Sequence, residues 1–214
     1  MRSKPAVRGL YAIVDSTVTP ETDLSVLTEE YLRGGASVIQ LRDKRRLESP
    51  DRERIFRDTA GRIQDLKARF DFIWIVNDDL GVAKAIGADG VHVGRDDPSP
   101  EECRRILGPD KIIGYSSHGL EEAVGAERRG ADYIAFGAIF STPTKGPGHP
   151  VQGLEKLRQV VKAVKIPVVA IGGINRSNIK DVLATGVHSV AMISALAKTG
   201  DRIEEARYFS ALFK

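Results

Sequence analysis

The sequence predicts an α/β protein in which residues 1–214 form a single (β/α)8 TIM barrel with short loops. Short segments rich in β-branched residues alternate with longer amphipathic segments, a pattern typical of a parallel sheet with helical crossovers. Eight such strand segments can be recognised, and eight βα units close into a barrel. At 214 residues the chain has room for one barrel and little room for a second domain.

The predicted strands are five or six residues long and rich in valine and isoleucine. They span residues 10–15, 37–42, 72–77, 89–93, 111–115, 133–137, 167–171 and 188–193. A weak internal repeat agrees with this division. A glycine that can end a helix, then a small residue, then a strand follow one another from Gly35, Gly87, Gly130 and Gly186. These repeats precede every second strand.

The segments between the strands are predicted to be helices. Residues 49–67 begin with Ser49 and Pro50, which suit a helix start, and residues 152–164 carry an apolar stripe at helical spacing. An open, doubly wound sheet is the alternative fold. It would have to hold eight parallel strands, and the first strand lacks the GxGxxG turn that is common in that fold.

The composition is that of an ordinary globular protein, with 42% hydrophobic and 29% charged residues. No apolar run approaches the ~18 residues that a membrane span needs, so we expect no membrane association. Residues 1–8 are basic, but the apolar segment of a secretory signal does not follow them. Cys103 is the single cysteine, so we expect no internal disulfide, no cysteine zinc site and a cytoplasmic location.

The net charge is +3 and the isoelectric point is about 9.0. Cationic and acidic residues are interspersed, and no nucleic-acid recognition motif accompanies them. We therefore expect no nucleic-acid partner, whereas a small positive excess suits an anionic small molecule. The sequence does not determine the oligomeric state and is compatible with a homo-oligomer.

In a barrel, the active site lies at the carboxyl ends of the strands. Polar, cationic and acidic residues lie at the ends of the predicted strands or in the loops that follow: Gln40, Arg42, Lys44, Asn77, Asp78, Asp97, Ser116, Thr142, Thr144 and Lys145. Gly172 and Gly173 after the seventh strand, with Ser194 after the eighth, match a recurring barrel phosphate site, although the glycines would also suit a tight turn. The loop around Lys145 suits either a cover over an anion or a plain solvent loop.

Asp78 and Asp97 follow neighbouring strands, so their carboxylates are expected to approach one another. Oxygen ligands without a nearby histidine or cysteine suit Mg²⁺. Helix capping is the alternative, because Asp97 precedes Pro98 and Asp78 lies just before a predicted helix. Both interpretations stay open. We interpret His92, within a strand, as part of the packed barrel rather than as a base.

With these motifs in this order, the chain resembles the thiamine-phosphate synthase (thiamine-phosphate pyrophosphorylase) family. The resemblance runs from residue 10 to about residue 196, with matching stretches at 35–44, 76–78, 87–94, 97, 114–118, 130–145 and 166–195. It implies a (β/α)8 barrel that joins 4-amino-2-methyl-5-(diphosphooxymethyl)pyrimidine to a thiazole phosphate, giving thiamine phosphate and pyrophosphate. It further implies Mg²⁺ and a dissociative substitution in which diphosphate leaves first.

The resemblance also implies roles for the site residues. The pyrimidine diphosphate site would comprise Gln40, Arg42, Lys44, Asn77, Ser116 and Lys145. The thiazole-phosphate site would comprise Thr142, Thr144, Gly173, Ile193 and Ser194. Asp78 and Asp97 would bind Mg²⁺. Lys145, Arg42 and Lys44 are the expected catalytic residues, because they would stabilise charge that develops on the leaving diphosphate.

The chain departs from the family pattern at four positions. Asp79 stands where arginine is usual, Arg95 where glutamine is frequent, and Ser141 where proline is frequent. Tyr115 replaces a small aliphatic residue. We expect Tyr115 to lie beside the pyrimidine site, where a large side chain would alter the shape of the site.

Two other functions are alternatives. A thiazole tautomerase-like relative on the same fold would need an acid or base near the ligand, where this chain has Ala138. A noncatalytic phosphate-ligand-binding barrel would bind its ligand without turnover.

Overall fold

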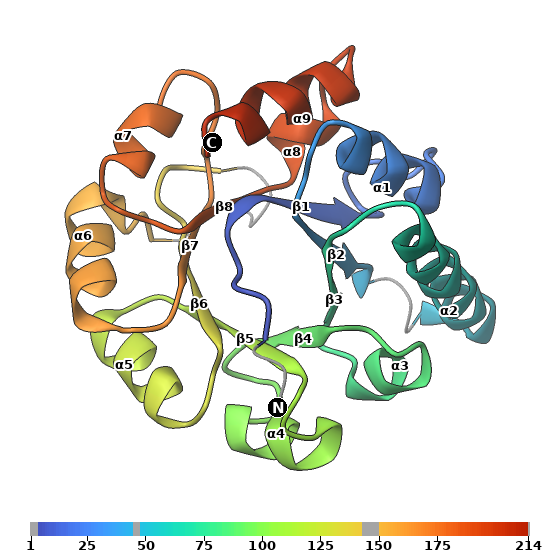
Figure 1. The fold of residues 1–214 in the computed structure, drawn as a ribbon, viewed down its shortest axis with the longest axis horizontal. Helices are drawn as coiled ribbons and strands as arrows, with labels where there is room; N and C mark the ends of the chain where they lie inside the picture. The colour runs from blue at the N-terminus through green and yellow to red at the C-terminus, as the bar shows by residue number, and fades with distance from the viewer. Residues whose placement is uncertain (1–3, 45–47, 143–149, 214) are drawn as a thin grey trace.

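Eight parallel strands form a closed barrel in which each strand pairs with the next along the chain and β8 pairs with β1 (Figure 1). The computed structural model describes residues 4–44, 48–142 and 150–213. The strands are β1 (Gly9–Asp15), β2 (Val38–Arg42), β3 (Ile73–Asn77), β4 (Gly90–Val93), β5 (Ile112–Ser117), β6 (Tyr133–Gly137), β7 (Val168–Ile171) and β8 (Ser189–Met192). The predicted barrel is confirmed, and the open-sheet alternative is wrong because the β8–β1 pair closes the sheet.

Helices cover the outside of the barrel (Figure 1). They are α1 (Leu24–Arg33), α2 (Pro50–Asp65), the 3₁₀ turn η2 (Leu66–Ala68), α3 (Leu80–Ala85), α4 (Pro100–Leu107), α5 (Leu120–Arg128), α6 (Gly153–Ala163), α7 (Ile179–Leu183), α8 (Ser194–Ala197) and α9 (Arg202–Ala211). As predicted, Ser49 caps α2 by accepting a hydrogen bond from the Arg52 amide, and Pro50 occupies the first turn. None of the helices in the described parts of the chain is long and apolar enough to cross a membrane.

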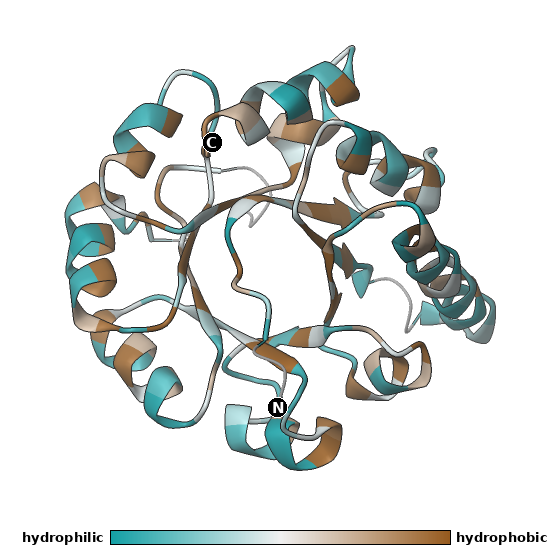
Figure 2. Ribbon diagram, in the orientation of Figure 1, coloured by the Kyte–Doolittle hydropathy of each residue, from teal (hydrophilic) through white to brown (hydrophobic). Residues whose placement is uncertain are grey.

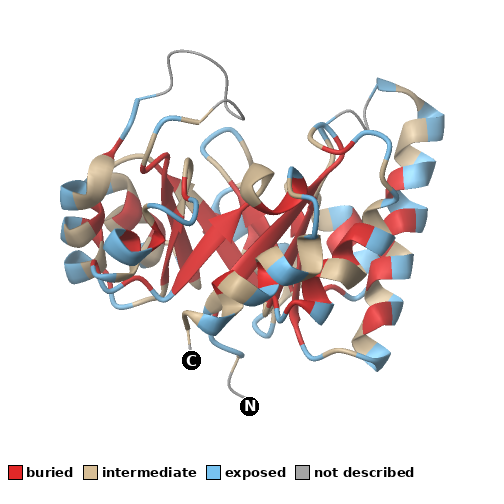
Figure 3. Cartoon of the chain, turned by 90° about the horizontal axis from the view of Figure 1, so that it is seen from above, coloured by how far each residue is buried: buried red, intermediate tan, exposed pale blue. Residues whose placement is uncertain are grey.

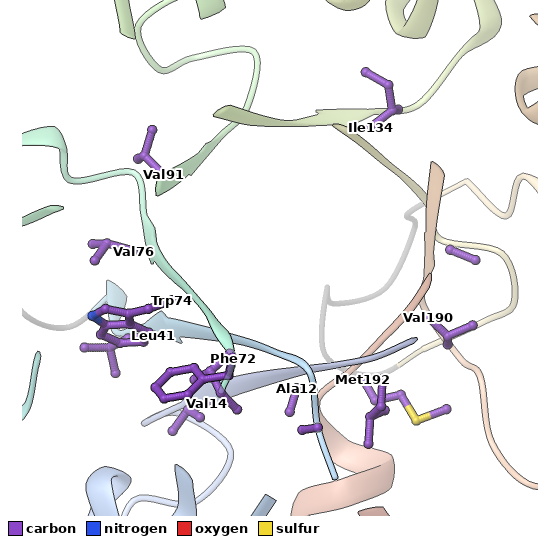
Figure 4. Packing of buried hydrophobic residues seen from close by; sticks show 14 of the residues in the cluster. Ala12, Val14, Leu41, Phe72, Trp74, Val76, Val91, Ile134, Val190 and Met192 are labelled. Carbon is purple, nitrogen blue, oxygen red and sulfur yellow. The ribbon is translucent and has the colours of Figure 1, made fainter. Parts of the chain in front are cut away.

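The side chains of the strands form two buried layers, because successive side chains of a strand point to opposite faces of the sheet. One layer packs between the barrel and the helices, and Figure 4 shows members of it such as Val76, Val91 and Val190. The other layer fills the barrel interior and includes Tyr11 and Tyr133. Burial is concentrated in the strands (Figure 3), which are largely hydrophobic, whereas the helices carry many hydrophilic residues (Figure 2).

Candidate active site

A pocket opens at the carboxyl ends of the strands and takes lining residues from strands all around the barrel. Five of the predicted site residues line it: Gln40, Arg42, Asn77, Ser116 and Ile193. They come from β2, β3, β5 and the residue after β8, so the closed barrel brings together positions that are far apart in sequence. The lining also contains apolar side chains, among them Ile13, Ala135 and Ile171.

A second pocket adjoins the first over the ends of β7 and β8. Four predicted residues line it: Thr142, Gly173, Ile193 and Ser194. The two pockets share Ile171, Ala191 and Ile193. The site therefore has two contiguous compartments, and the apolar residues between them belong to both.

The backbone conformation after β7 requires glycine at two successive positions. Gly172 has a φ of 101° and Gly173 a φ of 69°, in the region that side chains disfavour. A Cβ on Gly173 would also lie 2.5 Å from the carbonyl oxygen of Ser141. The tight-turn explanation for these glycines therefore holds, and the turn that they make forms part of the second pocket.

Asp78 and Asp97 face each other at the ends of β3 and β4. Burial raises the pKa of the Asp78 carboxyl above its ordinary value, and the negative charge of Asp97 raises it further. Lys44 opposes this effect, with its Nζ 3.5 Å from Asp78 Oδ2. Asp78 has a φ of 61°, and its amide donates to the carbonyl oxygen of His92 across the β3–β4 edge. Asp97 Oδ2 accepts a hydrogen bond from the Gly94 amide at 2.8 Å.

Helix capping does not account for either aspartate. Asp79, not Asp78, caps α3, because its Oδ1 accepts from the Val82 amide at 2.8 Å. Ser99, not Asp97, caps α4 by accepting from the Glu102 amide. The capping alternative is therefore wrong for both residues.

The chemistry of the Asp78–Asp97 pair fits a magnesium ion. Two carboxylates that repel each other gain stability when a divalent cation lies between them. Mg²⁺ commonly takes one or two carboxylates and completes its shell with water and substrate phosphate oxygens. Among residues 4–44, 48–142 and 150–213 there is no cluster of three or more histidine, cysteine or acidic side chains that would make an all-protein metal cage.

Arg42 is held in place by a residue that sequence reasoning missed. Its guanidinium forms an ion pair with Asp15, at the end of β1, whose side chain is fully buried. Asp15 also accepts hydrogen bonds from the amide and hydroxyl of Thr17. Asp15 and Arg42 are partners in the β1–β2 register, so the pairing was visible only once the neighbouring strands were known.

Two of the predicted residues, Thr144 and Lys145, lie outside the residues that the structure describes. Lys44 is described and is 60% exposed at its side chain, so it reaches the site from the rim.

Residues to which the sequence analysis gave no binding role also line the first pocket, among them Tyr11, His92 and His118. The prediction that His92 is packed within the barrel is right, since it is 7% exposed, but its ring also hydrogen-bonds to Ser116. The alternation of β4 could have shown this, because Val91 faces the helices and its neighbour His92 must face inward.

Comparison with known proteins decides the family. A family model described as thiamine monophosphate synthase matches residues 10–196. The thiamine-phosphate synthase of Clostridium acetobutylicum is 40% identical over 205 residues, which cover 96% of this chain and 94% of that protein. The thiamine-phosphate synthase of Chlorobium phaeobacteroides is 41% identical, with 98% of both chains covered. This chain belongs to the thiamine-phosphate synthase family.

The same family appears among solved structures. A thiamine phosphate pyrophosphorylase from Pyrococcus furiosus superposes with a TM-score of 0.82 at 40% identity, and 96% of each chain is covered. The predicted resemblance is confirmed, and with it the prediction that the chain is an enzyme with thiamine-phosphate synthase activity.

The expectation for Tyr115, a departure from the thiamine-phosphate synthase pattern, is wrong. Tyr115 belongs to the layer between barrel and helices, and the Arg129 guanidinium lies 5.8 Å from the centre of its ring. The next residue, Ser116, faces the pocket instead. Because adjacent strand residues point to opposite faces, Tyr115 does not line the pocket. Arg95 lies on the surface, where it pairs with Glu122.

Proposed function

We propose that the two compartments bind the two substrates of thiamine phosphate synthesis. The first would take 4-amino-2-methyl-5-(diphosphooxymethyl)pyrimidine, the second a thiazole phosphate, and the products would be thiamine phosphate and pyrophosphate. The observation that carries this proposal is the contiguity of two pockets in a chain of this family, the first of them lined by Asn77, the residue that precedes Asp78. Residues 1–214 would act as a single catalytic domain.

The first pocket has the chemistry for a polar ring with an anionic tail. Gln40, Asn77 and Ser116 supply amide and hydroxyl groups for hydrogen bonds to a pyrimidine. Arg42 and Lys44 supply positive charge at the mouth, and Lys145 would add a third cation on the diphosphate. The Asp15 ion pair restricts the guanidinium of Arg42, so less freedom is lost when the anion binds.

The second pocket suits a monophosphate. The Gly172–Gly173 turn brings backbone close to the cavity, and Thr142 and Ser194 add hydroxyl donors. Thr144 would contribute a further hydroxyl. Ile193 lies in both linings, where it would contact both rings at the point at which they join.

Asp78 and Asp97 would hold Mg²⁺ together with diphosphate oxygens. The ion would neutralise negative charge on the diphosphate. Lys44, 3.5 Å from Asp78, lies close enough to the carboxylate pair to contact the same diphosphate.

The substitution would be dissociative. The bond between the methylene carbon and the diphosphate oxygen breaks, and its electron pair leaves with the oxygen. The pyrimidine ring delocalises the remaining positive charge, and the thiazole nitrogen then donates its lone pair to the carbon. Arg42, Lys44 and Lys145 stabilise the departing charge. Apolar residues such as Ile13, Ala135 and Ile171 limit the water that would otherwise capture the cation.

The alternatives predict different outcomes in one assay. A tautomerase-like protein would isomerise the thiazole compound alone, although the position where a base would stand is a buried alanine, Ala138. A noncatalytic barrel would bind both compounds and leave them unchanged. The test is chromatography with ultraviolet and mass detection, which also distinguishes isomers of equal mass, applied to each compound alone and to the mixture with Mg²⁺. Conversion of the mixture alone supports the proposal, and either of the other outcomes rejects it.

A further inference from the structure

We propose that Tyr11, Tyr133 and His92 form a directional hydrogen-bond relay that positions Gln40 and Ser116, so that these three are positioning residues for the first pocket. The inference rests on the proposed function in that Gln40 and Ser116 are assigned to the pyrimidine. It goes beyond that assignment by naming what fixes the donor and acceptor pattern of the pocket wall.

Five side chains from five strands form a continuous series of hydrogen bonds across the barrel interior. Gln40 Nε2 donates to the Tyr11 hydroxyl at 2.9 Å, and the Tyr11 and Tyr133 hydroxyls are 2.8 Å apart. The Tyr133 hydroxyl lies 2.9 Å from His92 Nδ1, and His92 Nε2 lies 2.8 Å from Ser116 Oγ. Four members of this series are buried, each with less than a tenth of its surface exposed: Gln40, Tyr11, Tyr133 and His92. Gln40 and Ser116, at its two ends, both line the pocket.

The donor at Gln40 sets the direction of every later bond. Each tyrosine hydroxyl has one proton and two hydrogen-bond neighbours among the described residues, so the proton of a hydroxyl that accepts from one neighbour is satisfied only by donation to the other. Tyr11 accepts from Gln40 and therefore donates to Tyr133, which in turn donates to His92 Nδ1. The histidine then carries its proton on Nε2 and donates it to Ser116 Oγ. The Ser116 proton is left to point away from His92, towards the pocket.

Burial keeps the phenol groups of Tyr11 and Tyr133 in their neutral, protonated form. Burial raises the pKa of both Tyr11 and Tyr133 above the ordinary value of a tyrosine. Neither hydroxyl therefore loses the proton on which the direction depends.

The barrel interior leaves a space that the phenol ring of Tyr133 fills. Gly114 on β5 lies directly against the ring, and a Cβ at that position would collide with the phenol carbon and oxygen. The Tyr133 ring also stacks on the His92 imidazole, with ring centres 5.5 Å apart and planes at 26°. Gly114 leaves room for a large polar side chain in the barrel interior, where an apolar residue would suffice for packing alone.

The first test reads the His92 tautomer in the protein without substrate, by ¹⁵N NMR of histidine-labelled samples. The expected result is a proton on Nε2 in the wild type and a mixture of tautomers in Tyr133→Phe, in which the Tyr133 hydroxyl no longer donates to Nδ1. Tyr31→Phe is the matched control, because Tyr31 is fully buried and its hydroxyl has no hydrogen-bond partner in the described part of the chain. A wild-type proton on Nδ1, or an unchanged tautomer in Tyr133→Phe, would overturn the relay.

The second test separates the two substrates kinetically. Tyr133→Phe should lower kcat/KM for the pyrimidine diphosphate about tenfold, as expected for one misplaced hydrogen-bonding group, while the KM of the thiazole phosphate stays unchanged. Tyr11→Phe, which separates Gln40 from the rest of the relay, should have an effect of similar size. Equal losses for both substrates, or losses matched by Tyr31→Phe, would reject the positioning role. An inactive wild type would refute the proposed function, and the NMR test would still decide the relay.

Discussion

Asp78 and Asp97 face each other beyond the carboxyl ends of the adjacent strands β3 and β4, and neither residue caps the helix that follows it. Their neighbours Asp79 and Ser99 perform that task. The two carboxylates thus have no part in starting a helix, and burial together with the charge of Asp97 raises the pKa of Asp78. This pair is the site that we propose for Mg²⁺.

Replacement of either aspartate should remove most activity and leave the fold intact. Asp78→Ala and Asp97→Ala are each expected to lower kcat by about a hundredfold or more, because the charge on the diphosphate would lose its counter-ion. Activity measured across a magnesium titration tests this. An unchanged Mg²⁺ requirement in both variants would contradict the metal assignment.

Asp79→Ala is the matched control, since Asp79 is adjacent in sequence and caps α3. Loss of this cap should cost about 1 kcal/mol of stability and leave the Mg²⁺ requirement as it is in the wild type. Thermal denaturation and the same magnesium titration measure the two effects separately.

The raised pKa of Asp78 has a consequence for stability. A carboxyl whose folded-state pKa lies above its unfolded value of 3.8 stabilises the fold below that pH, and the contribution is lost as pH rises through the folded-state pKa. Without metal, Asp78→Asn should therefore melt at a higher temperature than the wild type at neutral pH, and the difference should vanish below pH 3.8.

Melting curves across pH, with a chelator and then with Mg²⁺, check this prediction. Magnesium should stabilise the wild type more than Asp78→Asn, because only the wild type has both carboxylates. A variant that is less stable than the metal-free wild type at neutral pH would show that the ionised carboxylate is favourable without a cation.

Ser194→Ala should weaken the thiazole phosphate more than the pyrimidine diphosphate. Ser194 lines the second pocket and not the first, and a lost hydrogen bond to a charged phosphate costs about 1.5–3 kcal/mol. Separate KM values for the two substrates test this. Ser177→Ala, which removes an exposed hydroxyl bonded to Asn175, should change neither. Equal effects of Ser194→Ala on both substrates would refute the two-compartment map.

Lys145→Ala should lower kcat and kcat/KM by similar factors. Its charge is proposed to act as negative charge builds up on the departing diphosphate, so the loss falls on the transition state. Lys165→Ala, just before β7 at the opposite end of the barrel, is the control and should have no effect. Steady-state kinetics test this prediction. A normal kcat with only a raised KM would show that Lys145 binds the substrate in the ground state and does not stabilise the transition state.

Sequence periodicity predicted the barrel because each strand and helix carries its own local pattern. The same alternation could have placed Tyr115, since Ser116 had been assigned to the pocket and its neighbour must then face the helices. Other features needed the folded chain. Asp78 and Asp79 are identical in type, and only the folded chain shows that Asp79 caps α3 whereas Asp78, with a φ of 61°, lies beside Asp97. The Asp15–Arg42 pair depends on the register of β1 and β2, and the Tyr11–Tyr133 contact joins β1 to β6, so no local pattern predicts either.

The central claim is that one end of the barrel joins a pyrimidine diphosphate to a thiazole phosphate. The most direct measurement follows the purified protein with both compounds and Mg²⁺ by chromatography with mass detection, and omits each component in turn. The account predicts thiamine phosphate and pyrophosphate in equal amounts, and no thiamine phosphate when either compound is omitted. Binding of both compounds without product, or product formed equally well by Asp78→Ala and Asp97→Ala, would contradict it.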